Sequence, residues 1–461
     1  MSSHPRRSVL IVGGGLAGLA AGVSLSRSGL RVTLLEKRPF LGGRAFSFDD
    51  PETGIEVDNG QHVFVGACTE YMQFLRDIYA WQNVRMPGRL SARVIRNGKS
   101  AWLRSSSWIP GAAANLPALL KYSHLSLTGR MRVLYGMMRI RFTGNPSETE
   151  TFETWLRRHG QTDETLSRFW NLIVLPSLND DISVVSASAG IMLFQTALLG
   201  APSKAAIGYP VVGLSRLAGD AAQGVIEAHG GEVRKSVDVH ELTMDGGQAT
   251  GVRLSSGEAL SADAVVVALP AAAMRDLLPD GYTETDFFKP SGSVETAPIV
   301  GVHIWYNRQV LDDPFVAVLD SPLQWVFNVT RMHERETGQR DDGQHIAISL
   351  SGAWQWRDST KAELRETFAG EMASVFPAAA TATINRFITV KMLDATFRVT
   401  PGAERHRLPQ QTPVPGLFLA GDWTHTGWPS TMESAVRSGN LASEAVTRYL
   451  SSEPGVGAYS N

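Results

Sequence analysis

An apolar run at the start of the chain leads directly into a group of closely spaced glycines. Residues 9–12 are all apolar, Gly13, Gly15 and Gly18 follow, and a second apolar run ends at Glu36. In a strand–turn–helix–strand unit, Gly13 permits the tight turn, Gly15 lets backbone N–H groups approach a pyrophosphate, and Gly18 lets the helix pack against the strand. An acidic residue about twenty positions further on can accept a hydrogen bond from a ribose hydroxyl. The pattern predicts an α/β domain in which a helix N-terminus binds the phosphates of a dinucleotide.

The same region has one feature of an export signal, because Arg6 and Arg7 precede the apolar run. The glycines interrupt that run, and no small-residue cleavage site comes before the folded sequence begins. The only cysteine is Cys68, so the chain has neither an internal disulfide nor a cysteine-based metal cluster, which suits a reducing compartment. We therefore expect a cytoplasmic protein.

Charge and hydropathy exclude two classes of protein. The chain has 43 basic and 45 acidic residues, so no global field attracts it to nucleic acid. No apolar run approaches the roughly eighteen residues of a membrane-spanning helix. With 461 residues, of which 43% are hydrophobic, the chain is long enough for two or three domains with a sizeable core.

The distribution of short β segments predicts two interleaved domains. Residues 233–239, 249–254 and 264–269 indicate an antiparallel ribbon that returns to a buried strand. We expect a dinucleotide-binding domain, a second domain that carries most of the tryptophans, and a flexible tail. The dinucleotide-binding domain comprises residues 1–70, 207–293 and 396–450, the second domain comprises residues 71–206 and 294–395, and the tail comprises residues 451–461.

Four further motifs accompany the glycine fingerprint. They are Gly42-Gly43-Arg44, Asp58-Asn59-Gly60-Gln61-His62, Gly421-Asp422 after a buried strand, and Thr431-Met432-Glu433-Ser434-Ala435 at the start of a helix. As a set, these motifs resemble the flavin-dependent amine oxidase and phytoene desaturase superfamily. The resemblance implies a Rossmann-type FAD-binding domain with an interleaved, mixed α+β substrate domain.

The resemblance also implies which residues contact FAD. Val237 would contact the adenine, residues 60–62 would form the floor under the flavin, Gly421 and Asp422 would meet the ribityl and pyrophosphate groups, and Met432 and Glu433 the isoalloxazine edge. The full implied set is Gly13, Gly15, Leu16, Ala17, Gly18, Glu36, Lys37, Gly43, Arg44, Gly60, Gln61, His62, Val237, Gly421, Asp422, Thr431, Met432, Glu433 and Ala435.

Further segments resemble one branch of the superfamily, the squalene-associated flavin desaturases, or hydroxysqualene dehydroxylases of hopanoid biosynthesis. These segments are Phe169-Trp170-Asn171, residues 176–179, Ala395-Thr396-Phe397 and residues 427–433. The branch implies reduction of the allylic alcohol hydroxysqualene to squalene, with reduced FAD as the hydride donor. It also implies that other squalene-forming enzymes are partners of the protein. Three alternatives stay open: a carotenoid desaturase, a flavin amine oxidase, and a non-catalytic flavoprotein scaffold.

Loss of hydroxide from an alcohol requires an acid that donates a proton. His62, Asp394 and Glu433 are the candidates for this catalytic role. Two of them also have a structural interpretation: His62 as a half-buried histidine with its hydrogen bonds satisfied, and Glu433 as a charge that complements a helix dipole.

Residues 119–142 predict an amphipathic helix with a basic face. Its cations are Lys121, Arg130, Arg132, Arg139 and Arg141. Such a helix is typical of a protein that rests on an anionic bilayer, here the inner face of the membrane. The alternative is a surface helix whose apolar side packs on the core.

Overall fold

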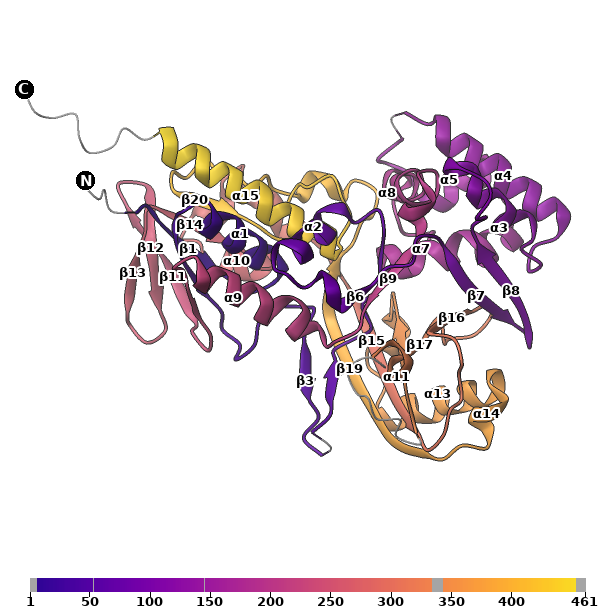
Figure 1. Ribbon diagram of the computed structural model, residues 1–461. Helices are drawn as coiled ribbons and strands as arrows, with labels where there is room; N and C mark the ends of the chain where they lie inside the picture. Colours follow the sequence, from indigo (N-terminus) through magenta and orange to yellow (C-terminus); the bar gives the residue numbers. More distant parts are fainter. Residues whose placement is uncertain (1–5, 53, 145, 334–342, 453–461) are drawn as a thin grey trace, which may run out of the picture.

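The computed structural model describes residues 6–52, 54–144, 146–333 and 343–452, which form two parts side by side (Figure 1). One part is built on a parallel sheet and contains both described ends of the chain. The other is built on a larger mixed sheet with a cap of helices. The chain passes between the two parts several times, so neither part is a continuous segment.

A five-stranded parallel sheet forms the core of the first part. Its order is β10 (Glu232–Arg234), β2 (Arg31–Leu35), β1 (Ser8–Val12), β14 (Ala264–Val267) and β20 (Leu417–Leu419). The central strands are apolar and almost entirely buried, as expected when both faces of a parallel sheet are covered. One face packs against α1 (Leu16–Arg27), α9 (Ala221–Ala228) and α15 (Met432–Ser452). This architecture confirms the predicted α/β, Rossmann-type domain.

The opposite face of the parallel sheet is covered by an antiparallel ribbon and by α10 (Ala271–Leu277). The ribbon consists of β11 (Val239–Asp245), β12 (Gln248–Leu254) and β13 (Ala259–Ser261). The prediction that residues 233–239 form a ribbon strand was wrong. Residues 232–234 pair in parallel with β2 instead, and the chain turns at Ser236, with φ of 58°, before the ribbon begins.

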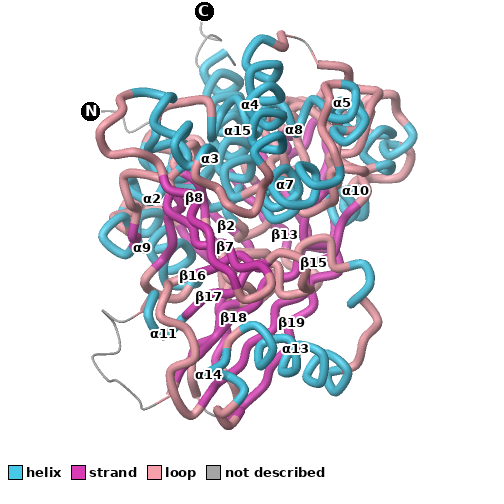
Figure 2. Tube along the Cα trace, turned by 90° about the vertical axis from the view of Figure 1, so that its right-hand side faces the viewer, coloured by secondary structure: helices cyan, strands magenta, loops and turns pink. Residues whose placement is uncertain are grey.

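A seven-stranded mixed sheet organises the second part. Its order is β19 (Ile384–Phe397), β15 (Thr296–Tyr306), β18 (Gln344–Leu350), β17 (Trp325–Asn328), β16 (Phe315–Val318), β7 (Ser91–Arg96) and β8 (Lys99–Arg104). Figure 2 shows α13 (Lys361–Val375) and α14 (Pro377–Ala380) at the lower end of this sheet and a group of helices above it. Successive side chains point to opposite faces, so one apolar set packs on α13 and the other faces the helical cap.

The helical cap is formed mainly by residues 111–198. Its helices are α3 (Leu116–Leu120), α4 (Leu127–Phe142), α5 (Phe152–Arg158), α6 (Asp163–Thr165), α7 (Asn171–Leu178) and α8 (Ala187–Leu193). Wider π-helical turns extend these helices at η3 (Leu166–Trp170) and η4 (Phe194–Leu198), and another, η6 (Ser215–Asp220), precedes α9. The helix expected over residues 119–142 is therefore two helices, because the chain leaves helical geometry between Lys121 and Ser126.

Short elements connect the two parts. Two small sheets pair β3 (Ser47–Asp49) with β4 (Glu56–Asp58), and β9 (Ile207–Pro210) with β5 (Phe64–Val65) and β6 (Val84–Arg85). Short helical turns occur at α11 (Val329–Met332), η1 (Trp81–Asn83), η2 (Gly111–Asn115), η5 (Pro202–Ala205), η7 (Tyr282–Glu284), η8 (Lys289–Ser293), η9 (Trp354–Trp356) and η10 (Ala403–His406).

Two expected boundaries lie elsewhere in the structure. The boundary at residue 70 falls inside α2 (Thr69–Asp77), whose buried Tyr71, Phe74 and Leu75 pack in the core of the first part, against α15. The expected tail begins inside α15, which continues to Ser452; residues 453–461 lie outside the described residues. The first difference arises because packing against α15, not local composition, decides that α2 belongs to the first part.

A pair of buried histidines lies on the capped face of the seven-stranded sheet. His303 Nδ1 is 3.0 Å from His345 Nε2, and the His345 ring stacks on Trp305 with a centroid distance of 3.9 Å. Burial lowers the pKa of His303 to about 4, although the Asp58 carbonyl acts in the opposite direction. Burial and the neighbouring His303 lower the pKa of His345 well below its usual value.

Acid is expected to destabilise the protein through His303. Below pH 6.5 the unfolded chain binds a proton at this histidine, whereas the folded chain does so only near pH 4. Its neutral form therefore stabilises the fold fully above pH 6.5, and that contribution is lost as the pH falls through this window. When the pH is lowered from 7 to 5, the unfolding free energy of the wild type should fall by about 2 kcal/mol more than that of the His303→Gln variant.

Urea unfolding of the FAD-saturated protein measures this difference. His240→Gln is the matched control, because His240 is exposed on β11. The same pH dependence in the wild type and in His303→Gln would contradict the argument.

Candidate flavin site and apolar cavity

The predicted phosphate loop lies at the carboxyl end of β1. Gly13 has a φ of 109°, and a Cβ at this position would lie 2.5 Å from the Ala268 carbonyl oxygen. A Cβ at Gly18 would lie 1.9 Å from the Gly13 oxygen, so helix and turn are in backbone contact. Helix α1 begins at the buried Leu16 and Ala17, and its N-cap, Gly15, supplies no side chain to bind the first N–H groups. Those N–H groups are available to an anion.

Glu36 lies beside this loop, at the end of β2. Its buried carboxylate accepts hydrogen bonds from Gly14 N at 2.7 Å and from Arg38 N at 2.8 Å. Val237 N donates to the Glu36 carbonyl oxygen at 2.9 Å, so these two residues are adjacent, and their contacts with the adenine and the ribose stay predictions. The Lys37 side chain is exposed and pairs with Asp238 at 3.3 Å, and its contact with the cofactor stays a prediction.

The Gly42–Arg44 turn packs on the phosphate loop. Gly42 N donates to the Gly14 carbonyl oxygen at 2.9 Å, and a Cβ on Gly43 would lie 2.8 Å from Gly15 Cα. Arg44 extends from this contact and forms an ion pair with Asp422. Its other terminal nitrogen donates to the Ala395 carbonyl oxygen at 2.9 Å. Segments near both ends of the chain therefore meet at one guanidinium group.

The Gly421–Asp422 turn completes this side of the site. Gly421 N donates to Ser438 Oγ at 2.8 Å, which holds the turn against α15. The second oxygen of the buried Asp422 carboxylate accepts a hydrogen bond from Ser430. Both carboxylate oxygens thus have protein partners, and direct contact of Arg44 or Asp422 with the cofactor stays a prediction.

Arg407 was not predicted from the sequence, although it holds the same turn. Its buried guanidinium donates to the carbonyl oxygens of Asp422 at 3.1 Å, Trp423 at 3.3 Å and Thr424 at 2.6 Å. It also pairs with Glu404 at 2.8 Å. No motif in the sequence marks this arginine, because its partners are backbone carbonyls that only folding brings together.

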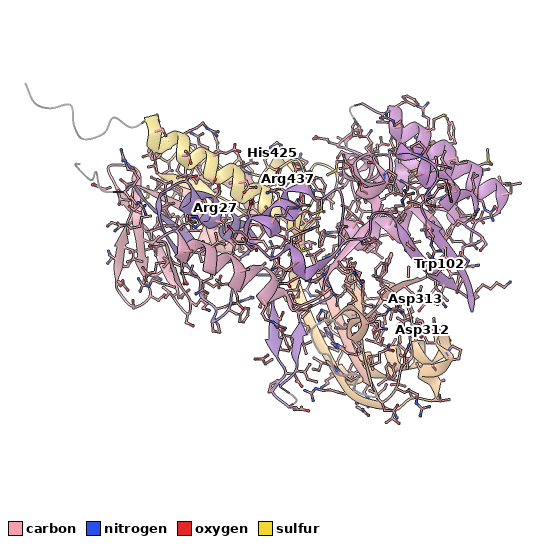
Figure 3. All side chains as sticks on the ribbon, viewed as in Figure 1. Arg27, Trp102, Asp312, Asp313, His425 and Arg437 are labelled. Atoms are coloured by element: carbon pink, nitrogen blue, oxygen red, sulfur yellow. The ribbon has the colours of Figure 1, made fainter. Side chains whose placement is uncertain are left out.

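The start of α15 separates into two faces. Thr431, Met432 and Ala435 are only half-buried, as expected for residues that face a bound cofactor. Glu433 points the other way and is fully buried. Its carboxylate accepts from Tyr71 N at 2.8 Å, Glu70 N at 3.2 Å and Arg437 Nε at 2.8 Å; Figure 3 labels Arg437 near the start of α15. This geometry favours a structural role at the N-terminus of α2, and proton donation by Glu433 stays a prediction.

Residues 59–62 form a separate wall of the site. The Asn59 side chain accepts from Phe46 N at 3.2 Å and donates to the Arg44 carbonyl oxygen at 2.8 Å, which joins this segment to the Arg44 turn. A Cβ on Gly60 would meet no atom within 4 Å. The Gln61 side-chain nitrogen is buried without a protein partner. His62 Nδ1 is 2.7 Å from the Gly60 carbonyl oxygen, and burial lowers the pKa of His62.

Asp394 is the third candidate for the proton donor. It is exposed on β19, and its carboxylate accepts a hydrogen bond from Thr296 Oγ1 at 2.6 Å. Exposure does not favour a role in a site that must exclude water. Of the three candidates, His62 is the one that is neither exposed nor fully engaged at a helix end, and its role as proton donor stays a prediction.

These residues fit FAD. The glycine contacts leave a cradle that side chains would fill, the N-terminus of α1 lacks a side-chain cap, and the Gln61 amide has an unused donor beside open space at Gly60. A phosphate-bearing, planar cofactor supplies what each of these groups lacks. Cys68 is buried under α2, and burial raises its pKa to about 12, so its thiol is unreactive.

An apolar cavity of about 150 Å³ lies between the helical cap and the seven-stranded sheet. Leu134 and Met137 of α4, Leu119 of α3, and Val94 of β7 contribute to its wall. Val65, three residues after His62, also lines it. Only Asn115, Ser177 and Trp325 bring polar groups, and no lining side chain is charged. The cavity is therefore suited to a neutral, apolar ligand.

Comparison with known proteins assigns the family. Residues 16–447 match the family described as flavin containing amine oxidoreductase. The chain belongs to this family.

Two relatives and one solved structure illustrate its range. The chain is 24% identical over 462 residues to 15-cis-phytoene desaturase of Solanum lycopersicum, covering 95% of this chain and 77% of the relative. It is also 24% identical over 466 residues to 15-cis-phytoene desaturase of Synechococcus elongatus, covering 95% of both chains. An oxidoreductase from Methanosarcina mazei superimposes with a TM-score of 0.72 at 17% identity, covering 96% of this chain and all of that one. The protein is thus a flavin-dependent oxidoreductase, and its cofactor is FAD.

Removal of the Glu36 carboxylate is expected to weaken FAD binding about tenfold or more. Glu36→Ala removes two hydrogen bonds to a charged acceptor and leaves the Gly14 N–H without its partner beside the phosphate loop. Quenching of FAD fluorescence during reconstitution measures the affinity. Glu232→Ala, which removes an exposed carboxylate from neighbouring β10, is the control and should bind FAD as the wild type does. Equal affinity in all three proteins would contradict the assignment.

Proposed function

We propose that this flavoprotein reduces hydroxysqualene to squalene. The observation that carries the proposal is the uncharged apolar cavity that reaches Val65, beside the segment from Gly60 to His62. Two of the four branch-like segments noted in the sequence contribute to the wall of this cavity: Phe169 lines it, and so does Ser177 of the segment of residues 176–179. A C30 chain is larger than 150 Å³, so part of the substrate extends toward the protein surface near Leu116, which is 47% exposed.

The reaction replaces a C–O bond of the substrate by a C–H bond. Reduced FAD supplies a hydride when it is bound, and the hydroxyl group leaves as water after it receives a proton. The protein must orient the carbinol carbon, exclude water and deliver that proton. His62 Nδ1 donates to the Gly60 carbonyl oxygen, since a carbonyl only accepts, which leaves Nε2 to carry the transferred proton. Because burial lowers its pKa, protonated His62 is a stronger acid than an exposed histidine.

Carotenoid desaturation is the second candidate, because the two curated relatives described above are phytoene desaturases. The same cavity suits a hydrocarbon substrate, and only the direction of hydride transfer differs. An amine oxidase is less well supported, since a cationic amine requires a charged or polar wall and the cavity has no charged lining residue.

A single turnover distinguishes these reactions. Photoreduced enzyme, mixed without oxygen with hydroxysqualene in deuterated buffer, is expected to give squalene with one deuterium at the former carbinol carbon. The reason is that the hydrogen transferred from reduced flavin exchanges with solvent. Mass spectrometry of the product and the absorbance of reoxidised flavin provide the measurement.

Phytoene with the oxidised enzyme is the parallel assay. Desaturated phytoene without squalene formation would assign the protein to the carotenoid desaturases. Turnover of neither substrate would favour the flavoprotein scaffold, and squalene without deuterium would exclude direct hydride transfer.

We further propose that α4 rests on an anionic bilayer. The residues of α4 that face the core are the small or medium-sized Gly129, Val133, Gly136 and Ile140. Five large apolar side chains of α4 point outward and are 46–82% exposed: Leu127, Met131, Tyr135, Met138 and Phe142. At 100° per residue these five form one stripe, with Arg132 and Arg139 on one flank and Arg130 and Arg141 on the other. An apolar stripe between cations suits a helix that lies in the membrane interface.

The neighbouring surface extends this stripe. Leu116 and Leu120 of α3 are each 47% exposed, and Trp108 is 93% exposed. The expected basic face therefore consists of two basic flanks around an exposed apolar stripe, and α4 packs on the core through a different apolar side that includes Val133 and Ile140. None of the described helices has both the length and the apolar character needed to cross a bilayer.

Replacement of Arg139 and Arg141 by Glu is expected to weaken binding to anionic liposomes more than tenfold, because each basic residue near the surface contributes about 1 kcal/mol. Met131→Glu with Met138→Glu should also abolish binding, at low and high salt alike, because it removes the inserted side chains. Leu441→Glu, an exposed leucine on α15, is the control and should bind as the wild type does. Co-sedimentation of all variants to the same extent would place the membrane contact elsewhere or exclude it.

A further inference from the structure

The wall of the apolar cavity contains a buried indole N–H, that of Trp325, for which the described residues provide no acceptor. Two other residues of the wall carry polar side chains, Asn115 and Ser177. The Asn115 amide has partners at both its oxygen and its nitrogen, because it accepts from Ser105 Oγ at 2.6 Å and donates to the Leu198 carbonyl oxygen at 2.8 Å. Trp325 differs, because its indole nitrogen is buried and has no partner. A buried donor without an acceptor costs free energy unless a ligand or water supplies one. Trp325 also lines the cavity, so a ligand in the cavity is in a position to supply the acceptor that the described residues do not provide.

The position of Trp325 in the sheet relates it to the cofactor site. The register aligns Gly301 of β15 with Ser349 of β18, and Ser349 with Trp325 of β17, so the three side-chain positions lie in one row on the same face. A Cβ on Gly301 would lie 3.2 Å from the Asn59 carbonyl oxygen and 3.7 Å from Gly60 Cα. The Asn59–Gly60 segment therefore packs on that row. Two strand spacings, about 10 Å, separate it from the position of Trp325.

We propose that Trp325 Nε1 donates a hydrogen bond to the oxygen atom of an otherwise apolar ligand, and that this bond selects an alcohol over the corresponding hydrocarbon. This inference rests on the proposed function, because it concerns the same cavity and names hydroxysqualene as the alcohol. Trp325 is a specificity residue in this scheme. It positions the hydroxyl group beside the wall formed by residues 59–62, and it takes no part in the transfer of hydride or proton.

The physical reason for selectivity is the cost of an unmade hydrogen bond. A hydrocarbon fills the apolar part of the cavity as well as the alcohol does, but it leaves the indole N–H without an acceptor. A site built around such a donor discriminates against the analogue that lacks the polar atom. Removal of the N–H should abolish the preference without changing the shape of the ligand's apolar part.

Equilibrium binding to the oxidised holoenzyme tests the proposal without turnover. Hydroxysqualene and squalene are added in detergent micelles, and the absorbance change of bound FAD reports the dissociation constant. We expect the wild type to bind hydroxysqualene about tenfold more tightly than squalene. Trp325→Phe should lose this preference by binding hydroxysqualene about tenfold more weakly, with squalene affinity unchanged within twofold.

Trp356→Phe is the matched control. The Trp356 indole nitrogen is also buried without a partner, but its ring packs on Phe368 on the α13 side of the sheet, away from the cavity. This variant should bind both ligands as the wild type does. Equal affinity of the wild type for both ligands, or an unchanged preference in Trp325→Phe, would overturn the proposal.

A second measurement covers the case in which Trp325→Phe fails to fold or to bind FAD. In the wild type with ¹⁵N-labelled tryptophan, one indole N–H resonance should shift downfield with hydroxysqualene and not with squalene. Absence of any such shift would also overturn the proposal.

The outcomes separate this proposal from the proposed reaction. A preference for the alcohol that depends on Trp325, without squalene formation by the reduced enzyme, would support alcohol recognition and refute dehydroxylation. Squalene formation with no effect of Trp325→Phe on binding would refute only the role of Trp325.

Discussion

The Gly42–Arg44 turn lies directly against the phosphate loop because neither Gly15 nor Gly43 carries a side chain. With 2.8 Å between the Cβ position of Gly43 and Gly15 Cα, any larger residue at Gly43 would separate the two turns. Their contact sets the position of Arg44, whose guanidinium binds Asp422 and whose carbonyl oxygen binds the Asn59 side chain. The phosphate loop, the flavin floor and the C-terminal turn are thus held together through one residue.

Buried polar groups in this protein divide into two kinds. Arg407 and Glu433 are fully satisfied by backbone groups and ion pairs, and each fixes a turn or a helix end. The Gln61 amide nitrogen and the Trp325 indole nitrogen are buried and unsatisfied. Buried polar groups that have hydrogen-bond partners within the protein stabilise the scaffold. Buried donors without such a partner, where they border a cavity, are free to bind a ligand. This distinction separates the structural carboxylate of Glu433 from the residues expected to meet cofactor or substrate.

The seven-stranded sheet connects cofactor site, cavity and surface. One face packs on α13, and the other carries the row from Gly301 to Trp325 beneath the cavity. The cap above it leaves five large apolar residues of α4 in solvent, whereas the buried face of this helix carries Gly129, Val133, Gly136 and Ile140. Exposure of that many large apolar side chains on one helix is unusual for a surface in water and is typical of a contact surface.

The sequence by itself determined the dinucleotide-binding unit, since glycine spacing, apolar runs and Glu36 act within about thirty consecutive residues and leave little choice of local geometry. It also indicated that segments near both ends of the chain serve one cofactor. It did not determine where residues 233–239 pair, where α2 packs, or which side of α4 is buried, because each depends on a partner distant in the chain. Arg407 shows the limit most clearly: its partners are backbone carbonyls, which carry no sequence signature. Tertiary structure alone decided that Glu433 binds the end of α2, that Asp394 is exposed, and that Trp325 lacks an acceptor, because burial and hydrogen bonding are properties of the assembled surfaces.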